Sequence, residues 1–187
     1  MGELRVVEPV LPLVCAFSSD PNALAYAKER SCEYWGPIAL ASPEFEFTET
    51  TYYAASMGER IRKCFWVFEK LADPGQLADW KLLTNGWENS LATSQHWISC
   101  NNSFSRPINI DPGYITPAKL VLASTKDHAH RIYLSQGIYA EITLMYRHGG
   151  WQHHEWTFPD YRRGDYQEFF AAARRHLKEL LAGRERQ

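Results

Sequence analysis

Hydrophobic and polar residues alternate along the first part of the chain in blocks that predict strand, helix and strand. Residues 10–18, VLPLVCAFS, form a continuous apolar run, which is typical of a strand that is buried on both faces. Asp20 is a good helix N-cap with proline directly after it, and we expect a helix over residues 21–35. A Gly-Pro pair at 36–37 stops this helix. Residues 44–48 then alternate polar and apolar, as in a half-buried strand.

The same order of elements follows again. Residues 48–58 form a polar loop, and residues 61–69 are rich in aromatic and β-branched side chains, which favours a third strand. Another Asp-Pro pair, with glutamine as the capping-box residue, starts a helix over residues 73–93. Residues 94–105 are polar and loop-like, and residues 106–111 form the fourth strand. The order βαββαβ predicts an α+β fold with a ferredoxin-like plait in residues 1–113.

A turn and a capped helix are expected to follow the plait. Thr116 is a suitable N-cap and Pro117 occupies the first helical position, so we predict a helix over residues 117–125. The letters LVLAST within it would also suit a strand. The cap formed by Thr116 and Pro117 favours the helix.

The rest of the chain predicts an antiparallel meander and a final helix. Residues 130–135 and 138–147 flank Gln136-Gly137, a suitable two-residue hairpin turn, and residues 151–158 supply a third strand. Residues 165–182 carry an apolar face at helical spacing. We therefore expect a single domain, 1–187, in which a helix, a three-stranded meander and a C-terminal helix (114–187) extend the plait.

Composition is compatible with one packed domain and disfavours nucleic acid as the main partner. The chain has 187 residues, of which 45% are hydrophobic and 14% aromatic, enough for a substantial core. Its formal net charge is −2, whereas domains that neutralise phosphate backbones are usually basic.

Cysteine spacing and hydropathy suggest a reducing compartment. The four cysteines contain no close pair, so we read them as reduced thiols; they are Cys15, Cys32, Cys64 and Cys100. No apolar stretch approaches the roughly 20 residues that span a bilayer. The apolar run at residues 10–17 follows acidic residues and contains a proline, unlike a signal peptide. We expect a cytoplasmic protein without a membrane partner.

A long central motif resembles a known family. The letters DPGYITPAKLVLASTKDHAHRIYLSQGIYAEITLMYRHGGW, followed by WTFPDYRRGDYQEFF, are similar to the bacterial domain-of-unknown-function 4416 family. The likeness continues through SSDP, TETTYY, FEKLADP and KLLTN, and so covers nearly the whole chain. Residues 48–53 resemble a commoner His-Thr-Asp-Tyr-Tyr form of the family, and Glu49 and Thr50 occupy two of its places. The resemblance implies no activity and no cofactor.

The segment from Asp111 to Arg131 is our first candidate site. A helix beginning near Thr116 would offer unpaired N–H groups and partial positive charge to a phosphate or carboxylate. Lys119 would lie unfavourably in its first turn unless an anion bound there. Lys126 and Arg131 could add positive charge. The alternative is structural, with Asp111 capping a turn, Lys119 paired to an acid and Arg131 extending to solvent.

The predicted hairpin register suggests chemistry for the same segment. A two-residue turn at Gln136-Gly137 would place Ile132 opposite Glu141, and Arg131 at the end of an apolar face, where it needs a partner or ligand. His130 and Glu141 would be diagonal neighbours able to act as an acid–base pair. Asp111 is the third candidate for proton transfer.

Metal and RNA sites are weighed as alternatives and disfavoured. His128, His130, His153 and His154 could contribute to a metal site with Glu155 or Asp160, but no high-specificity ligand spacing occurs. The letters KCFWVF at 63–68 resemble the aromatic strand of RNA-recognition modules but lack the glycines. Core packing is the better account of those aromatic residues.

Two further features complete the candidate ligand site. Tyr52 and Tyr53 lie in a loop, where paired aromatic residues often contact ligands. Asp160 is the obvious acid of the Pro-Asp-Tyr loop at 159–161, which could close over a site.

The favoured function is therefore binding, with or without turnover, of a small anionic ligand such as a nucleotide or phosphorylated metabolite. In this hypothesis Lys119, Lys126 and Arg131 hold the anion. The rival is a non-enzymatic interaction or ligand-sensing domain; a metal-dependent hydrolase and an RNA-binding module rank third. Convergence of the polar groups in one pocket would favour the first hypothesis, and dispersal over the surface the second.

Overall fold

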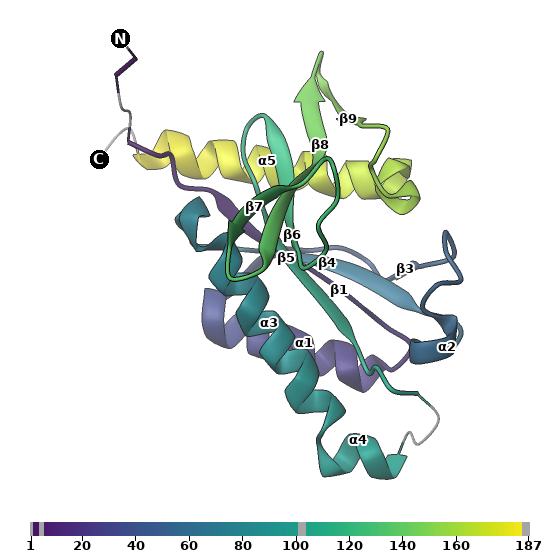
Figure 1. The fold of residues 1–187 in the computed structure, drawn as a ribbon. Coiled ribbons are helices and arrows are strands. Elements are labelled where there is room, and N and C mark those ends of the chain that lie inside the picture. The colour runs from purple at the N-terminus through teal and green to yellow at the C-terminus, as the bar shows by residue number, and fades with distance from the viewer. Residues whose placement is uncertain (1, 4–5, 101–103, 185–187) are drawn as a thin grey trace.

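A large antiparallel sheet with helices on both faces forms the fold, as seen in a computed structural model (Figure 1). The structure describes residues 2–3, 6–100 and 104–184. Within these ranges the strands are β1 (Leu11–Ser18), β2 (Ile38–Ala41), β3 (Phe45–Glu46), β4 (Arg62–Phe68), β5 (Asn109–Ile115), β6 (Lys119–Ser124), β7 (Ile132–Ser135), β8 (Ile138–Arg147) and β9 (Gly150–His153). The helices are α1 (Pro21–Trp35), α2 (Ala54–Met57), α3 (Leu77–Ala92), α4 (Gln95–Cys100) and α5 (Gly164–Arg184), with short 3₁₀ turns η1 (Pro74–Gln76) and η2 (Pro159–Arg162).

The described strands join in the order β2-β4-β1-β5-β6-β8-β7, while β3 adds to β4 and β9 adds to β8. Every pairing between them is antiparallel. The chain is thus a mixed α+β protein, as its pattern predicts, but its nine-stranded sheet is larger than the four strands of a plait.

Different helices cover the two faces of the sheet. On one face α1 and α3 pack through residues such as Leu24, Trp80 and Trp87. On the other face α5 packs through Phe170 and Leu177. All eight residues of β1 are buried, because the strand lies inside the sheet with helices on both sides. This position explains the continuous apolar run in its sequence.

Both Asp-Pro helix starts are confirmed. The carboxylate of Asp20 accepts a hydrogen bond from the N–H of Asn22 at 2.8 Å, which caps α1. The carboxylate of Asp73 accepts one from Gly75 at 2.8 Å, and there a short 3₁₀ turn leads into α3. These local contacts depend on neighbouring residues alone, so sequence predicts them well.

The predicted helix over residues 117–125 is wrong, because these residues form the β5–β6 turn and strand β6. The hydroxyl of Thr116 does accept hydrogen bonds from the N–H groups of Ala118 and Lys119, at 3.1 and 3.0 Å. Thr116 N–H, however, donates to the carbonyl of Lys119, which closes a hairpin turn. Hydroxyl contacts of this kind occur in turns as well as helix caps. The paired strands β5 and β8 then favour an extended chain.

The fourth strand does not end at Asp111 as predicted, because β5 continues through Pro112-Gly113 to Ile115. Proline normally interrupts a central strand, since it cannot donate to a neighbour. Here β6 pairs with β5 only from Gly113 onward, so Pro112 lies where that neighbour is absent.

The two-residue turn of the β7–β8 hairpin is confirmed, but its register is not the predicted one. Gln136 and Gly137 have φ of 52° and 78°, as a type I′ turn requires. A bulge between Tyr133 and Ser135 then shifts the pairing, so that Ile132 faces Ala140 rather than Glu141. Two-residue periodicity cannot reveal such a bulge.

Smaller elements also differ from the prediction. Strand β2 and helix α2 were not predicted, and α4 occupies part of the expected loop at 94–105, of which residues 101–103 lie outside the described ranges. The third meander strand, β9, ends at His153. Short elements carry too few residues for a periodic signal.

Candidate functional site

A cavity of about 260 Å³ lies where β5 and β6 separate. The two strands pair only over Gly113–Ile115 and Leu120–Leu122. At the last point of contact, a Cβ on Gly113 would lie 2.3 Å from the carbonyl oxygen of Val121. The glycine therefore allows the backbones to meet closely before they diverge.

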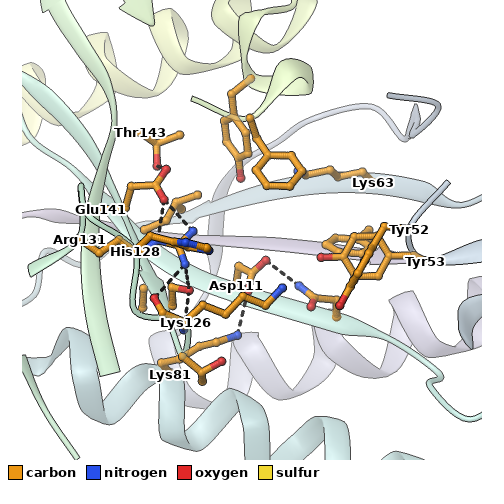
Figure 2. Close-up of a pocket in the computed structure, with 18 of the residues that line it drawn as sticks. Tyr52, Tyr53, Lys63, Lys81, Asp111, Lys126, His128, Arg131, Glu141 and Thr143 are labelled. Carbon is orange, nitrogen blue, oxygen red and sulfur yellow. Dashed lines mark hydrogen bonds and ion pairs between the residues drawn. The ribbon is translucent and has the colours of Figure 1, made fainter. Parts of the chain in front are cut away.

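Side chains from the sheet, from α3, from η2 and from the connecting loops line the cavity (Figure 2). Its aromatic and apolar lining consists of Phe17, Phe47, Tyr52, Tyr53, Leu122, Ala123, Phe158 and Tyr161. Its polar lining consists of Lys63, Lys81, Asn85, Arg106, Asn109, Asp111, Ser124, Thr125, Lys126, His128, Arg131, Glu141 and Thr143.

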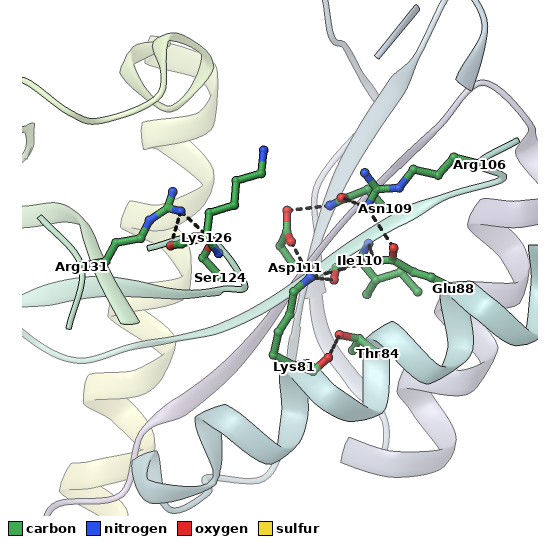
Figure 3. Close-up of polar contacts among 10 residues, drawn as sticks. All are labelled: Lys81, Thr84, Glu88, Arg106, Asn109, Ile110, Asp111, Ser124, Lys126 and Arg131. Atoms are coloured by element: carbon green, nitrogen blue, oxygen red, sulfur yellow. Dashed lines mark hydrogen bonds and ion pairs between the residues drawn. The ribbon is translucent and has the colours of Figure 1, made fainter. Parts of the chain in front are cut away.

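Two side chains of α3 replace the missing β6 partner along the free part of β5 (Figure 3). The ammonium of Lys81 donates to the carbonyl of Ile110 at 2.8 Å, and the carboxylate of Glu88 accepts from the Ile110 N–H at 2.7 Å. Lys81 and Glu88 are seven residues apart, so they project from the same side of the helix. The opened sheet thus keeps its backbone groups hydrogen-bonded.

Asp111 projects from this stretch of β5 into the cavity as a carboxylate held by neighbours. Lys81 donates to one oxygen at 2.8 Å and Asn109 to the other at 2.6 Å. Burial alone would raise the pKa of Asp111, but the charge and hydrogen bond of Lys81 hold that pKa below its ordinary value. Asp111 therefore presents a negative charge and hydrogen-bond acceptor to the cavity.

Glu88 stands behind this group. Its carboxylate accepts from Arg106 at 2.9 Å, yet burial raises the pKa of Glu88 above the ordinary value. The positions of Arg106, Lys81 and Glu88 tie α3 to β5, which fixes the wall from which Asp111 projects.

Lys63 and Asp160 form an ion pair beneath the cavity. Asp160 is fully buried and its carboxylate accepts a hydrogen bond from the Lys63 ammonium. The ammonium also lies 4.3 Å from the ring centroid of Tyr161 and 5.0 Å from that of Phe47. Burial would lower the pKa of Lys63, but Asp160 and the acidic groups nearby hold it above the ordinary value. The lysine is thus a cation.

Arg131 organises the loop between β6 and β7. Its guanidinium donates to the hydroxyl of Ser124 at 2.7 Å and to the carbonyl of Lys126 at 3.0 Å. It also pairs with the carboxylate of Glu141 at 2.9 Å. These contacts draw the loop against β8, so the backbone at Lys126 has a defined position.

Four rings stack in a column beside the same loop. His128 stacks on His130 at 5.7 Å between centroids, and His130 stacks on Trp156 at 5.3 Å. His154 also stacks on Trp156, at 4.5 Å between centroids. His130 also lies 3.2 Å from Glu141 through its Nε2. The column connects the cavity loop to the segment after β9.

Comparison with protein families shows to which family the chain belongs. A family described as "Domain of unknown function (DUF4416)" matches residues 8–177. The chain belongs to the DUF4416 family. All of the residues that line the cavity lie within the matched DUF4416 region. Searches of curated proteins and of solved structures gave no match.

Six of the nine site residues predicted from the sequence line the cavity of this DUF4416 protein. They are Tyr52, Tyr53, Asp111, Lys126, Arg131 and Glu141. His130 lies behind Glu141, and Asp160 lies below the lining, bound to Lys63. Lys119 does not line the cavity. The predicted helix, whose N-terminus was expected to bind an anion beside Lys119, is not formed, because these residues belong to strand β6.

Several lining residues of the DUF4416 cavity were missed. Lys63 begins an aromatic stretch of the chain for which core packing was the favoured account, and the lysine itself received no role. Lys81 lies on the buried side of α3, beside Trp80 and Thr84, and a charge among such residues is a signal of a polar contact. Both lysines lie less than a tenth exposed.

A metal site and a membrane-spanning helix are both absent from the described ranges. There, no group of three or more histidine, cysteine or acidic side chains has an arrangement that could hold a metal ion. No helix in these ranges is long and apolar enough to cross a bilayer.

Proposed function

We propose that the cavity of this DUF4416 protein binds a small anionic ligand, such as a nucleotide or a phosphorylated metabolite. Five cationic side chains line it against two carboxylates; the cations are Lys63, Lys81, Arg106, Lys126 and Arg131, and the carboxylates are Asp111 and Glu141. Asp160 and Glu88 neutralise Lys63 and Arg106 from behind the lining, and the charge of Lys126 remains in excess. A concave site with such a field attracts anions.

Lys126 carries the proposal. Each of the other four lining cations contacts a carboxylate within 4.0 Å. In the described part of the chain Lys126 forms no ion pair, and its ammonium lies 5.1 Å from the ring centroid of Tyr52. Arg131 holds the backbone of this loop, so the Lys126 side chain starts from a defined position at the cavity and its charge is uncompensated.

A thermal-shift screen with nucleotides and phosphorylated metabolites tests the proposal. A ligand that binds the folded state raises Tm, and Lys126→Ala should abolish or strongly reduce that rise. Lys119→Ala is the matched control, since it removes a lysine that lies outside the cavity lining and forms no described ion pair. Absence of any stabilising anion, or equal responses of both variants, would contradict the proposal.

Convergence of the polar groups supports ligand binding over a purely architectural motif. Asp111 and Glu141 come from two strands, Lys126 and Arg131 come from the loop between β6 and β7, and all four line one cavity. The function of an interaction domain would not require these side chains to surround a cavity. A parent protein that responds to no anion would return the preference to the interaction domain.

Proton transfer to the bound ligand is a second function that we propose for Glu141. Its carboxylate is 7% exposed, lines the cavity and contacts the Nε2 of His130. In this role Glu141 would act on the ligand, while His130 and Arg131 position it. Glu141→Gln should retain ligand binding and lose any conversion seen by NMR. His130→Gln should shift the pH dependence of that conversion.

We also propose that the first half of the chain is a ferredoxin-like plait. The strand order β2-β4-β1-β5, with α1 and α3 on one face of these strands, supports this assignment. An experimental structure that paired β2 elsewhere would contradict it.

A further inference from the structure

One side of the cavity is an aromatic wall that extends from the core to solvent. The ring of Phe17 lies 5.1 Å from Phe47 and 4.9 Å from Tyr53, and the ring of Tyr53 lies 4.9 Å from Tyr52. Exposure rises along this wall from 2% at Phe17 to 69% at Tyr52. Core packing explains the inner rings, but it does not explain why Tyr52 stands exposed at the cavity.

The other side of the cavity is polar. Glu141 and Thr143 lie opposite Tyr52 and Tyr53 in Figure 2, and the loop that carries Lys126 connects the two sides. The ammonium of Lys126 rests near the Tyr52 ring in an exposed cation–π contact, which is a weak interaction. An anion would attract this ammonium more strongly than the ring does.

Between the two sides Asp111 and Asn109 offer a different chemistry. The Asp111 carboxylate, whose pKa is lowered, accepts hydrogen bonds and repels anions. A phosphate would therefore avoid Asp111 and bind near Lys126. A hydroxyl group of the ligand, by contrast, could donate a hydrogen bond to the Asp111 carboxylate. Carboxylates bind ribose hydroxyls in this way at nucleotide sites.

We infer that the ligand is a nucleoside phosphate. Its base lies against Tyr52 and Tyr53, its ribose hydroxyls donate to Asp111, and its phosphate binds Lys126. This inference rests on the proposed function of the cavity and narrows it. A sugar phosphate would leave the aromatic wall unused, and inorganic phosphate would leave both the wall and Asp111 unused.

Ligand binding requires one rearrangement of the cavity. Lys126 now lies near the Tyr52 ring that the base needs, so its side chain moves from the ring to the phosphate. The hydrogen bonds of Arg131 to Ser124 and to the Lys126 carbonyl hold the loop backbone during this movement (Figure 3). Binding therefore exchanges a weak contact for an ion pair without refolding the loop.

Calorimetric titrations with adenosine and guanosine 5′-monophosphates, ribose 5-phosphate and adenosine test the inference. At least one nucleotide should bind about tenfold or more tightly than ribose 5-phosphate, in keeping with the energy of base–aromatic stacking. Tyr52→Ala should remove that advantage and leave ribose 5-phosphate binding unchanged. Tyr52→Phe should retain it. Tyr34→Ala, a change of another half-exposed tyrosine outside the cavity lining, should have no effect.

The outcomes separate this inference from the proposed function. Equal binding of nucleotide and ribose 5-phosphate, unaffected by Tyr52→Ala, would overturn the nucleoside assignment while an anion site remained. Binding of adenosine as tightly as its monophosphate would overturn the anion site itself. Failure of all phosphorylated probes in the titrations would likewise count against both.

Discussion

Lys63 and Asp160 place a charged pair inside the core, below a cavity that is itself rich in charge. Among the described residues, five aromatic rings lie within 6 Å of the Lys63 ammonium, and one oxygen of Asp160 finds no hydrogen-bond partner. A buried pair of this kind adds little net stability, but loss of one member leaves a buried charge uncompensated. The pair therefore fixes η2 to β4.

Asp160→Asn should destabilise the protein by about 3–5 kcal/mol in urea denaturation, because the Lys63 ammonium would lose its counter-charge. Asp165→Asn is the control, since it breaks a partly exposed ion pair with Arg163 and should cost at most about 1 kcal/mol. Similar losses in the two variants would show that Lys63 and Asp160 are not a coupled pair.

His154 makes stability depend on pH. Burial lowers the pKa of this imidazole below its ordinary value of 6.5, against the opposing charge of Glu141. Its Nε2 is buried and has no hydrogen-bond partner in the part of the chain that the structure describes. The unfolded chain therefore takes up the proton more readily than the folded chain. Stability from neutral His154 is present above pH 6.5 and is lost as pH falls below that value.

His154→Phe keeps a ring against Trp156 but cannot titrate. The free energy of unfolding of the parent protein, relative to this variant, should be higher at pH 7.5 than at pH 5.5. Denaturation curves at the two pH values measure the difference. If the difference in free energy of unfolding between parent and variant is the same at both pH values, His154 is not the titrating group.

At the scale of elements, the divergence of β5 and β6 creates the cavity. Close contact at Gly113 and the side chains of α3 along the free part of β5 make this divergence stable. The turn at Thr116 leads directly into β6, so Ser124 and Lys126 reach the cavity mouth at the end of that strand.

Gly113→Ala should cost about 1–3 kcal/mol, because the added methyl group would meet the Val121 carbonyl and the Leu122 side chain. It should also weaken ligand binding by displacing β6. Gly86→Ala adds the same group within α3, where nothing lies within 4 Å, and should stabilise the protein by about 0.5–1 kcal/mol. Chemical denaturation of both variants gives the comparison, and equal effects would argue against close packing at Gly113.

At the scale of the molecule, the two expected halves share one sheet. Strands β5 and β6 join residues 1–113 to the remainder, and both halves line the cavity. The apolar faces of the sheet are covered by α1 and α3 on one side and by α5 on the other. We therefore expect neither half to retain its core alone.

Unfolding should therefore be one cooperative transition. Far-UV circular dichroism and tryptophan fluorescence should give the same midpoint in urea, because tryptophans lie on both sides of the sheet, at Trp80 and Trp151 among others. Two separated midpoints would indicate that the halves fold independently.

The sequence by itself determined the features that depend on near neighbours. Asp20 and Asp73 cap their helices through residues two positions away, and Gln136-Gly137 forms its turn through its own backbone angles. The apolar periodicity of α5 likewise states which face must be buried. Local chemistry is complete within a few residues, and so a linear pattern can express it.

Only the tertiary structure decided the rest. Thr116 makes hydroxyl contacts that suit either a helix cap or a turn, and pairing with β5 and β8 selected the strand. The same applies to Lys63 and Lys81, whose partners Asp160 and Asp111 lie 97 and 30 positions away. Contacts over such separations depend on how the strands are ordered in space, and no pattern along the chain contains that order.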